Sequence, residues 1–84
     1  MPTTRFSYVC ILFSELEPAR HYVGLTDNLK SRLRRHNAGE VTHTAKHRPW
    51  KLEVAIAFRE RKGAAEFETY LKSHSGRAFA KRHF

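Results

Sequence analysis

Residues 8–13, with the sequence YVCILF, form the longest uninterrupted apolar run in the chain. The run is rich in strand-forming residues and short enough to be a single β-strand, and it is far too short to cross a membrane. In a chain of 84 residues there is little room for a second core. We therefore expect residues 1–84 to form one domain that contains a buried strand at 8–13.

Two further segments have the character of strands. After the polar loop 14–20, which contains Pro18, residues 21–25 predict a second strand that pairs with the first as an antiparallel hairpin. Residues 51–59 alternate in polarity, which predicts a strand with one face fully in the core. The apolar residues of that face are Leu52, Val54, Ile56 and Phe58.

The remaining elements are expected to be helices. Asp27 can cap a helix that ends at Gly39, where a left-handed residue is usual. A second helix is expected at 64–73 and a last helical turn or two at 76–84, whereas residues 40–50 have no clear period and predict a loop. The order β-β-α-β-α-α predicts an α/β (α+β) fold, a three-stranded, largely antiparallel sheet flanked by helices.

The charge balance restricts the class of partner. The chain has 16 Lys and Arg against 8 Asp and Glu, a formal net charge of +8. This basic balance favours a polyanionic partner such as nucleic acid. We expect no membrane association and a cytoplasmic location, because no signal or membrane-spanning pattern is present and the single cysteine, Cys10, excludes an internal disulfide.

Both main helices carry ionisable residues inside their apolar stripes. The first stripe comprises Leu29, Arg32, Leu33 and His36, and the second comprises Ala64, Phe67, Glu68 and Leu71. In one interpretation, Arg32 and Glu68 form an ion pair that only holds the two helices together. In the other, both stripes line a cleft in which Glu68 holds a divalent cation and Arg32 faces a phosphate.

The spacing of these residues resembles that of a known family. The triplets Tyr8-Val9-Cys10 and Tyr22-Val23-Gly24 stand where the GIY-YIG nucleases have their two motifs. Arg32 follows ten positions after Tyr22, His36 one helical turn later, and Glu68 lies on the helix after the third strand. The chain is similar to a small, single-domain bacterial branch of this family.

The resemblance implies a hydrolase, a divalent-metal-dependent endonuclease that cleaves phosphodiester bonds in nucleic acid, with DNA as the expected substrate. Tyr22 would orient or deprotonate the attacking water, alone or with His36. Arg32 would stabilise negative charge on the phosphate. Glu68 would be the sole protein carboxylate on one Mg²⁺ or Mn²⁺.

One residue departs from the family pattern. Cys10 stands where the first motif has a tyrosine, and a thiol is a shorter and weaker hydrogen-bond donor than a phenol. The alternative function is therefore a nucleic-acid-binding module that has kept the fold and lost or weakened its catalysis. A third alternative is a purely structural domain.

Several basic and aromatic residues have two interpretations. The residues expected to contact phosphates beside the cleft are Lys30, Arg34, Arg35, Thr44, Lys46 and Arg48. His43 and His47 belong either to a solvated basic loop or to a metal site, and Trp50 either covers the core or stacks on a base. Lys72, Arg77, Lys81 and Arg82 form either a solvated helix face or a second contact with a nucleic-acid backbone.

Overall fold

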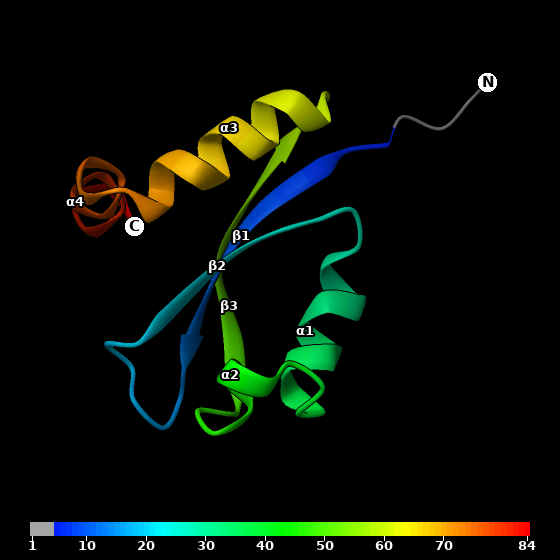
Figure 1. Cartoon of the computed structure of the whole chain (residues 1–84), viewed down its shortest axis with the longest axis vertical. Coiled ribbons are helices and arrows are strands. Elements are labelled where there is room, and N and C mark those ends of the chain that lie inside the picture. Colours follow the sequence, from blue (N-terminus) through cyan, green and yellow to red (C-terminus); the bar gives the residue numbers. More distant parts are fainter. Residues whose placement is uncertain (1–4) are drawn as a thin grey trace.

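The computed structural model describes residues 5–84 as an antiparallel sheet with helices on both faces (Figure 1). The elements are β1 (Ser7–Ser14), β2 (His21–Thr26), α1 (Leu29–Asn37), α2 (Thr42–Ala45), β3 (Trp50–Phe58), α3 (Arg61–Lys72) and α4 (His74–His83). The strand order is β2-β1-β3, and β1 is antiparallel to both neighbours. The predicted α+β fold and element order are confirmed.

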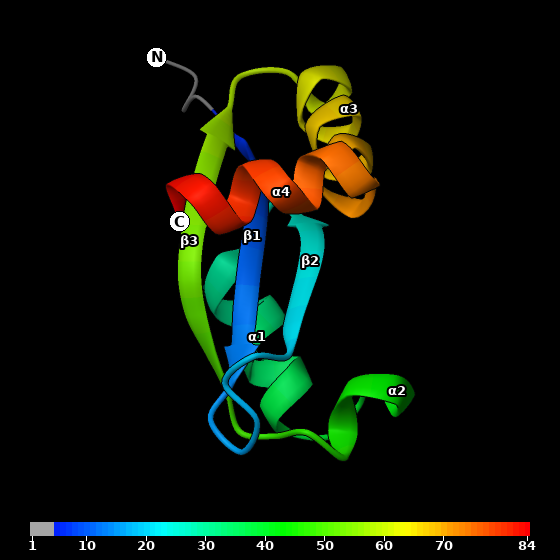
Figure 2. The same cartoon turned by 90° about the vertical axis from the view of Figure 1, so that its left-hand side faces the viewer.

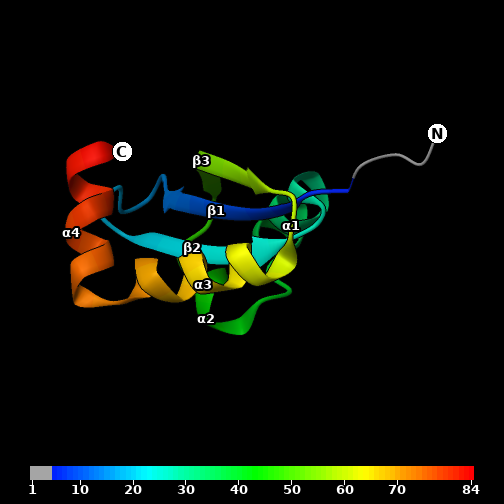
Figure 3. The ribbon, with the colours of Figure 1, turned by 90° about the horizontal axis from the view of Figure 1, so that it is seen from above.

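The central strand β1 divides the molecule into two apolar cores, because successive side chains of a strand point to opposite faces. Val9 and Ile11 pack with α3 and α4, in a core that includes Leu71. Cys10 and Leu12 face the other way and pack with α1. Figure 1 shows α1 on one side of the sheet and α3 with α4 on the other, and Figure 3 shows α3 running alongside β2.

Helix α1 begins one residue later than expected. Its N-cap is Asn28, whose side-chain oxygen accepts a hydrogen bond from the backbone N–H of Ser31 at 3.0 Å, so the assignment of this role to Asp27 is wrong. Asn and Asp are comparable caps, and the backbone of Asn28 has the required extended conformation. The predicted end is confirmed, since Gly39 adopts a φ of 80°.

Strand β3 does not present one continuous face to a single core. Its pairing with β1 shifts between Ile11, which lies opposite Val54, and Leu12, which lies opposite Leu52. Glu53 is the extra residue of this bulge, and a bulge reverses the alternation of side chains beyond it. Leu52 therefore leaves the α3 face and is 42% exposed, so the expectation of one fully buried face is wrong.

The segment after α1 is more ordered than the expected loop. Residues 42–45 form the short helix α2, which packs near the end of α1. At the other end of the chain, α4 is longer than a turn or two and crosses the sheet beside α3 (Figure 2). Gly76 permits this close crossing, because a Cβ there would lie 1.8 Å from the carbonyl oxygen of Tyr70.

Within residues 5–84, none of the helices combines the length and apolar character that a membrane span requires.

Candidate active site

Three side chains meet over Gly24 on the face of the sheet that α1 covers. Gly24 lies opposite Cys10 in the β1–β2 pairing. A Cβ at Gly24 would lie 3.2 Å from Cε1 of Tyr22, 3.6 Å from Nη2 of Arg32 and 3.6 Å from Sγ of Cys10. The missing side chain of Gly24 therefore leaves the space in which a phenol, a guanidinium and a thiol come together.

His36 of α1 is the fourth side chain of this cluster, and it packs against Tyr22. Its side chain is fully buried, and its ring lies 4.6 Å, centroid to centroid, from the ring of Tyr22. Nδ1 of His36 is 2.9 Å from the hydroxyl oxygen of Thr44, which donates its own proton to the carbonyl of Val41. Nδ1 is therefore the protonated nitrogen, and Nε2 keeps a buried lone pair with no hydrogen-bond partner among the described residues.

The turn that carries Thr44 is held against the end of α1 and the start of β3. The indole N–H of Trp50 donates to the carbonyl of Thr44 at 2.9 Å. The side chain of Asn37 accepts from the backbone N–H of Trp50 at 2.6 Å and donates to its carbonyl at 3.0 Å. These bonds explain why α2 forms where the sequence predicts a loop. They also assign Trp50, which is 2% exposed, to the core and not to base stacking.

The charge of Arg32 dominates the electrostatics of this cluster. Burial lowers the pKa of His36, and Arg32, His43 and Arg35 lower it further by repulsion. Nε of Arg32 is buried and has no hydrogen-bond partner within residues 5–84. Arg32 thus keeps an uncompensated charge and an unused donor beside Tyr22, as an anion-binding group would.

Glu68 approaches from the opposite side of the sheet. Burial raises the pKa of the Cys10 thiol, Arg32 lowers it and the carboxylate of Glu68 raises it again, so both charges act on one sulfur atom. The side chain of Glu68 is 21% exposed, and its carboxylate lies 3.5 Å from Nζ of Lys72. No ion pair joins Glu68 to Arg32 in the described part of the chain, so a simple helix-to-helix pair is excluded there.

The expectation of a cleft lined by the stripes of both helices is wrong. Leu29 and Leu33 of α1 pack against one face of the sheet, whereas Phe67 and Leu71 of α3 pack against the other. The two apolar stripes therefore do not line a common cleft. Glu68 belongs to α3, which contacts β2, the edge strand that carries Tyr22 and Gly24.

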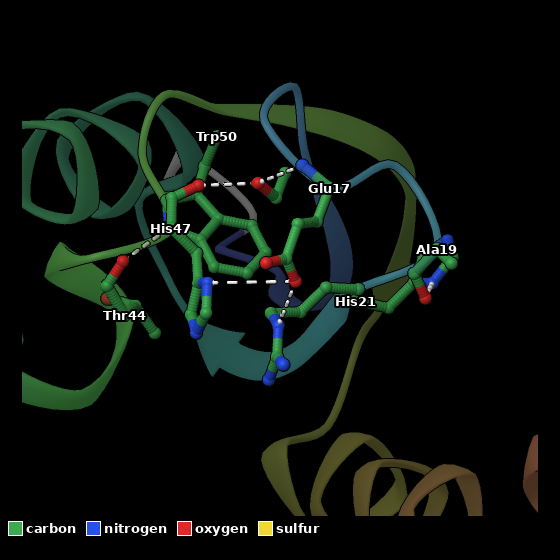
Figure 4. Close-up of polar contacts among 8 residues, drawn as sticks. Glu17, Ala19, His21, Thr44, His47 and Trp50 are labelled. Carbon is green, nitrogen blue, oxygen red and sulfur yellow. Dashed lines mark hydrogen bonds and ion pairs between the residues drawn. The ribbon is translucent and has the colours of Figure 1, made fainter.

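Tyr22 gives this cluster its access to solvent. It lines a small hollow of about 130 Å³ together with Arg20, His21, His43 and His47. Figure 4 shows Glu17 close to two of these residues: its carboxylate accepts a hydrogen bond from Nε of Arg20 at 3.0 Å and lies 4.0 Å from Nδ1 of His47.

Sequence reasoning missed Arg20 and His21 as neighbours of Tyr22. Arg20 lies in the loop before β2 and His21 is the first residue of β2, and no periodic pattern marks either position. Their only sequence signal is that they immediately precede Tyr22.

The predicted phosphate contacts have different surroundings. Lys30, Arg34, Arg35, Lys46 and Arg48 are exposed. Arg35 lies 3.8 Å from Glu40, a separation at which two exposed side chains interact weakly. Thr44 is 3% exposed and its hydroxyl is already engaged with His36 and Val41, so its assignment as a phosphate donor is wrong.

The described residues contain no cluster of ligands that would by itself form a metal site. No group of at least three His, Cys, Asp or Glu side chains within residues 5–84 is arranged to hold a metal, which disfavours a site built from His43 and His47. A half-buried carboxylate such as Glu68 suits Mg²⁺, because this ion keeps most of its waters and needs only one or two protein carboxylates.

A three-stranded antiparallel sheet with helices on both faces defines the class of this protein, a small α+β domain. The chain belongs to the GIY-YIG family, whose catalytic-domain model matches residues 6–82. Searches of the curated proteins and of the solved structures found no significant match. Membership of the family implies nuclease activity on nucleic acids, and its nucleases are generally dependent on a divalent metal.

Proposed function

We propose that this protein is a divalent-metal-dependent endonuclease that hydrolyses phosphodiester bonds in DNA. The observation that carries the proposal is the meeting of Tyr22 and Arg32 over Gly24. DNA is the proposed substrate. Because DNA has no 2′-hydroxyl that could attack its own phosphate, its hydrolysis requires a site that orients an external water.

Arg32 is the proposed stabiliser of the transition state. Its guanidinium is half-buried, its Nε is unpaired among the described residues, and no carboxylate there neutralises it. Negative charge grows on the phosphate oxygens during attack by water. A fixed cation with free donors stabilises that charge more than it stabilises the ground state.

Tyr22 is the proposed group that holds the attacking water, because it is the member of the cluster that lines the solvent-filled hollow. His36 is fully buried behind it and does not reach the substrate. We therefore assign His36 a positioning role: Thr44 fixes its tautomer, and its ring packs against that of Tyr22.

Glu68 is the proposed ligand of Mg²⁺ or Mn²⁺. When bound, such a metal would polarise the phosphate and neutralise charge on the leaving oxygen. Outside the site, the exposed residues Lys30, Arg34, Arg35, Lys46 and Arg48 would bind phosphates and orient the nucleic acid without reading its sequence.

The direct test uses purified protein with labelled single-stranded, duplex and branched DNA and with RNA, in Mg²⁺, in Mn²⁺ and in EDTA. We expect metal-dependent DNA cleavage that Glu68→Ala abolishes while binding is largely retained. The matched control is Glu66→Ala, which removes an exposed carboxylate of the same helix and should leave cleavage unchanged. Absence of cleavage by the wild type with either metal would refute the proposal.

Cys10 favours a second candidate function, a nucleic-acid-binding module with weakened catalysis. The thiol is 1% exposed and lies next to the Gly24 space, where the family motif has a phenol. Because this position is tightly packed, Cys10→Tyr would overpack the strand face, and a gain of activity is expected only if the ring extends over Gly24. Salt-sensitive binding without cleavage would identify this second function.

A further inference from the structure

A second and larger hollow lies on the opposite side of Tyr22 from α2. This groove has a volume of about 1060 Å³ and runs between the start of β2 and helix α4. We call it the α4 groove. Its floor is apolar and includes Ile11, Val23, Leu71 and Ala80, with Phe84 at its edge. The volume lies at the upper end of the roughly 300–1,000 Å³ typical of small-molecule sites, so the groove suits an extended ligand.

Basic side chains form most of the rim of the α4 groove. They are Arg20, His21, Lys72, Arg77 and Lys81, and the acidic residues of the rim are Glu17 and Glu53. Glu17 is already paired with Arg20 and Glu68 with Lys72. Within residues 5–84, no carboxylate lies within ion-pair distance of Arg77 or Lys81, so α4 presents two uncompensated cations to the groove.

The α4 groove is continuous with the candidate active site. Tyr22 lines both this groove and the smaller hollow beside His43, and Arg20 and His21 also belong to both. A polymer whose phosphate lies at Tyr22 would therefore enter the groove on the side of α3 and α4 as it leaves the site. Figure 2 shows α4 lying across the sheet, and residues of α4 line this groove together with residues from the start of β2.

We propose that the α4 groove binds an unpaired nucleic-acid strand next to the phosphate that is cleaved. This inference rests on the proposed nuclease function and adds the substrate class to it. The cations of the rim complement the phosphates, and the apolar floor complements base and sugar faces. A duplex keeps its base faces stacked inside and would use only the rim, whereas an unpaired strand exposes them to the floor.

The test is a binding measurement in EDTA, so that cleavage does not interfere. Fluorescence anisotropy gives the affinities of a labelled single-stranded DNA and of its duplex at several salt concentrations. We expect the wild-type protein to bind the single strand more tightly.

The charge of the rim is tested by the double variant Arg77→Ala/Lys81→Ala. It should weaken single-strand binding at least tenfold at low salt and reduce the slope of log K against log salt by about 1.4, since each phosphate contact contributes about 0.7. The control is Arg61→Ala/Lys62→Ala, which removes two exposed cations from the first turn of α3, away from α4. Equal losses in the two variants would overturn the proposal, because only the net charge would then matter.

The apolar contribution to strand binding is tested by Phe84→Ala, at the edge of the groove. The ring of Phe84 is 44% exposed, and we expect its removal to lower single-strand affinity about tenfold and to leave duplex affinity unchanged. Phe6→Ala, which removes a ring that is 37% exposed and lies outside the groove, is the matched control. Duplex binding as tight as single-strand binding, together with no effect of Phe84→Ala, would overturn the inference.

If the nuclease proposal is wrong, the experiments should give a different set of results. In that case the wild type cleaves no substrate with Mg²⁺ or Mn²⁺, while the preference for a single strand and its loss in Arg77→Ala/Lys81→Ala remain. Conversely, cleavage that depends on Glu68 together with binding that does not depend on α4 would refute the groove alone.

Discussion

The two faces of the sheet differ in the polarity of the side chains that are buried against them. On the face covered by α3 and α4, the buried core consists of Val9, Ile11, Ala64 and Leu71, all of them apolar. The face covered by α1 also has an apolar core, but it buries His36 and places Arg32 beside it. Both buried side-chain nitrogens that lack a hydrogen-bond partner in the described chain, Nε of Arg32 and Nε2 of His36, belong to this second face.

This difference between the two cores predicts that substitutions in them have different effects. An unpaired buried polar atom costs about 1–3 kcal/mol, so the α1 face is less stable than an apolar face of the same size. The α3/α4 face contributes apolar burial that offsets this cost. Substitutions of the buried apolar residues of the α3/α4 core should therefore act mainly on stability, whereas substitution of Arg32 on the α1 face should act mainly on function.

The largest expected effect is on stability, for Leu71→Ala on the α3/α4 face. Leu71 is 2% exposed at the centre of that core, and truncating such a residue costs about 2–5 kcal/mol. In a domain of this size the melting temperature should fall by more than about 10 °C. Thermal unfolding followed by circular dichroism measures this, and single-strand binding should weaken as well, because Leu71 lines the α4 groove. A melting temperature within a degree or two of the wild type would contradict the division between the faces.

The next effect is on catalysis, for Arg32→Ala on the α1 face. Turnover should fall about 10²–10³-fold, the usual scale for removing one transition-state donor. The melting temperature should change by only a few degrees, because the lost side chain includes an unpaired buried nitrogen. Arg61→Ala, an exposed residue of α3, is the control for charge alone. A large loss of stability with unchanged turnover would make Arg32 a structural residue.

A moderate effect is expected for Gly76→Ala, where α4 crosses α3. The added Cβ would collide with the backbone of Tyr70, so α4 must move. Overpacking of this kind costs about 1–3 kcal/mol. We expect a lower melting temperature and weaker single-strand binding, because the α4 groove is distorted. Gly63→Ala is the control, since a Cβ there would meet only the ring of Phe58 at 3.5 Å. Equal effects of the two substitutions would contradict this account.

The smallest expected effect is a pH dependence of stability that arises from His36. Its pKa in the folded protein is lowered, so between this pKa and about 6.5 the unfolded chain binds more protons than the folded one. Stability is therefore complete above about pH 6.5 and falls as the pH decreases toward the folded pKa. Melting temperatures measured between pH 7.5 and 5.0 should decrease more for the wild type than for His36→Gln. A parallel decrease in both proteins would show that other groups are responsible. His21→Gln, at an exposed position, should behave as the wild type.

The strands and helices were predictable because their signals are local. The apolar run at 8–13, the hairpin and the helix ending at Gly39 follow from residue type and period, and all three are present. The bulge at Glu53 was not predictable, because an extra residue in a strand is defined only by the partner strand. Helix α2 was missed for a similar reason: the bonds that hold it join Thr44 to His36 and Trp50, which lie in other elements.

For the candidate site too, part was predictable from local signals in the sequence and part depended on long-range packing. The sequence by itself determined the family and predicted the set Tyr22, Arg32, His36 and Glu68, because ordered motifs at given separations can be recognised along a chain. Only the tertiary structure decided that α1 and α3 lie on opposite faces, that His36 is enclosed behind Tyr22, and that Thr44 is occupied. The physical reason is that helical periodicity defines which side of a helix is buried and leaves open which face of the sheet buries it. That choice depends on packing between residues distant in sequence, and it places Arg32 and Glu68 on helices at opposite faces of the sheet.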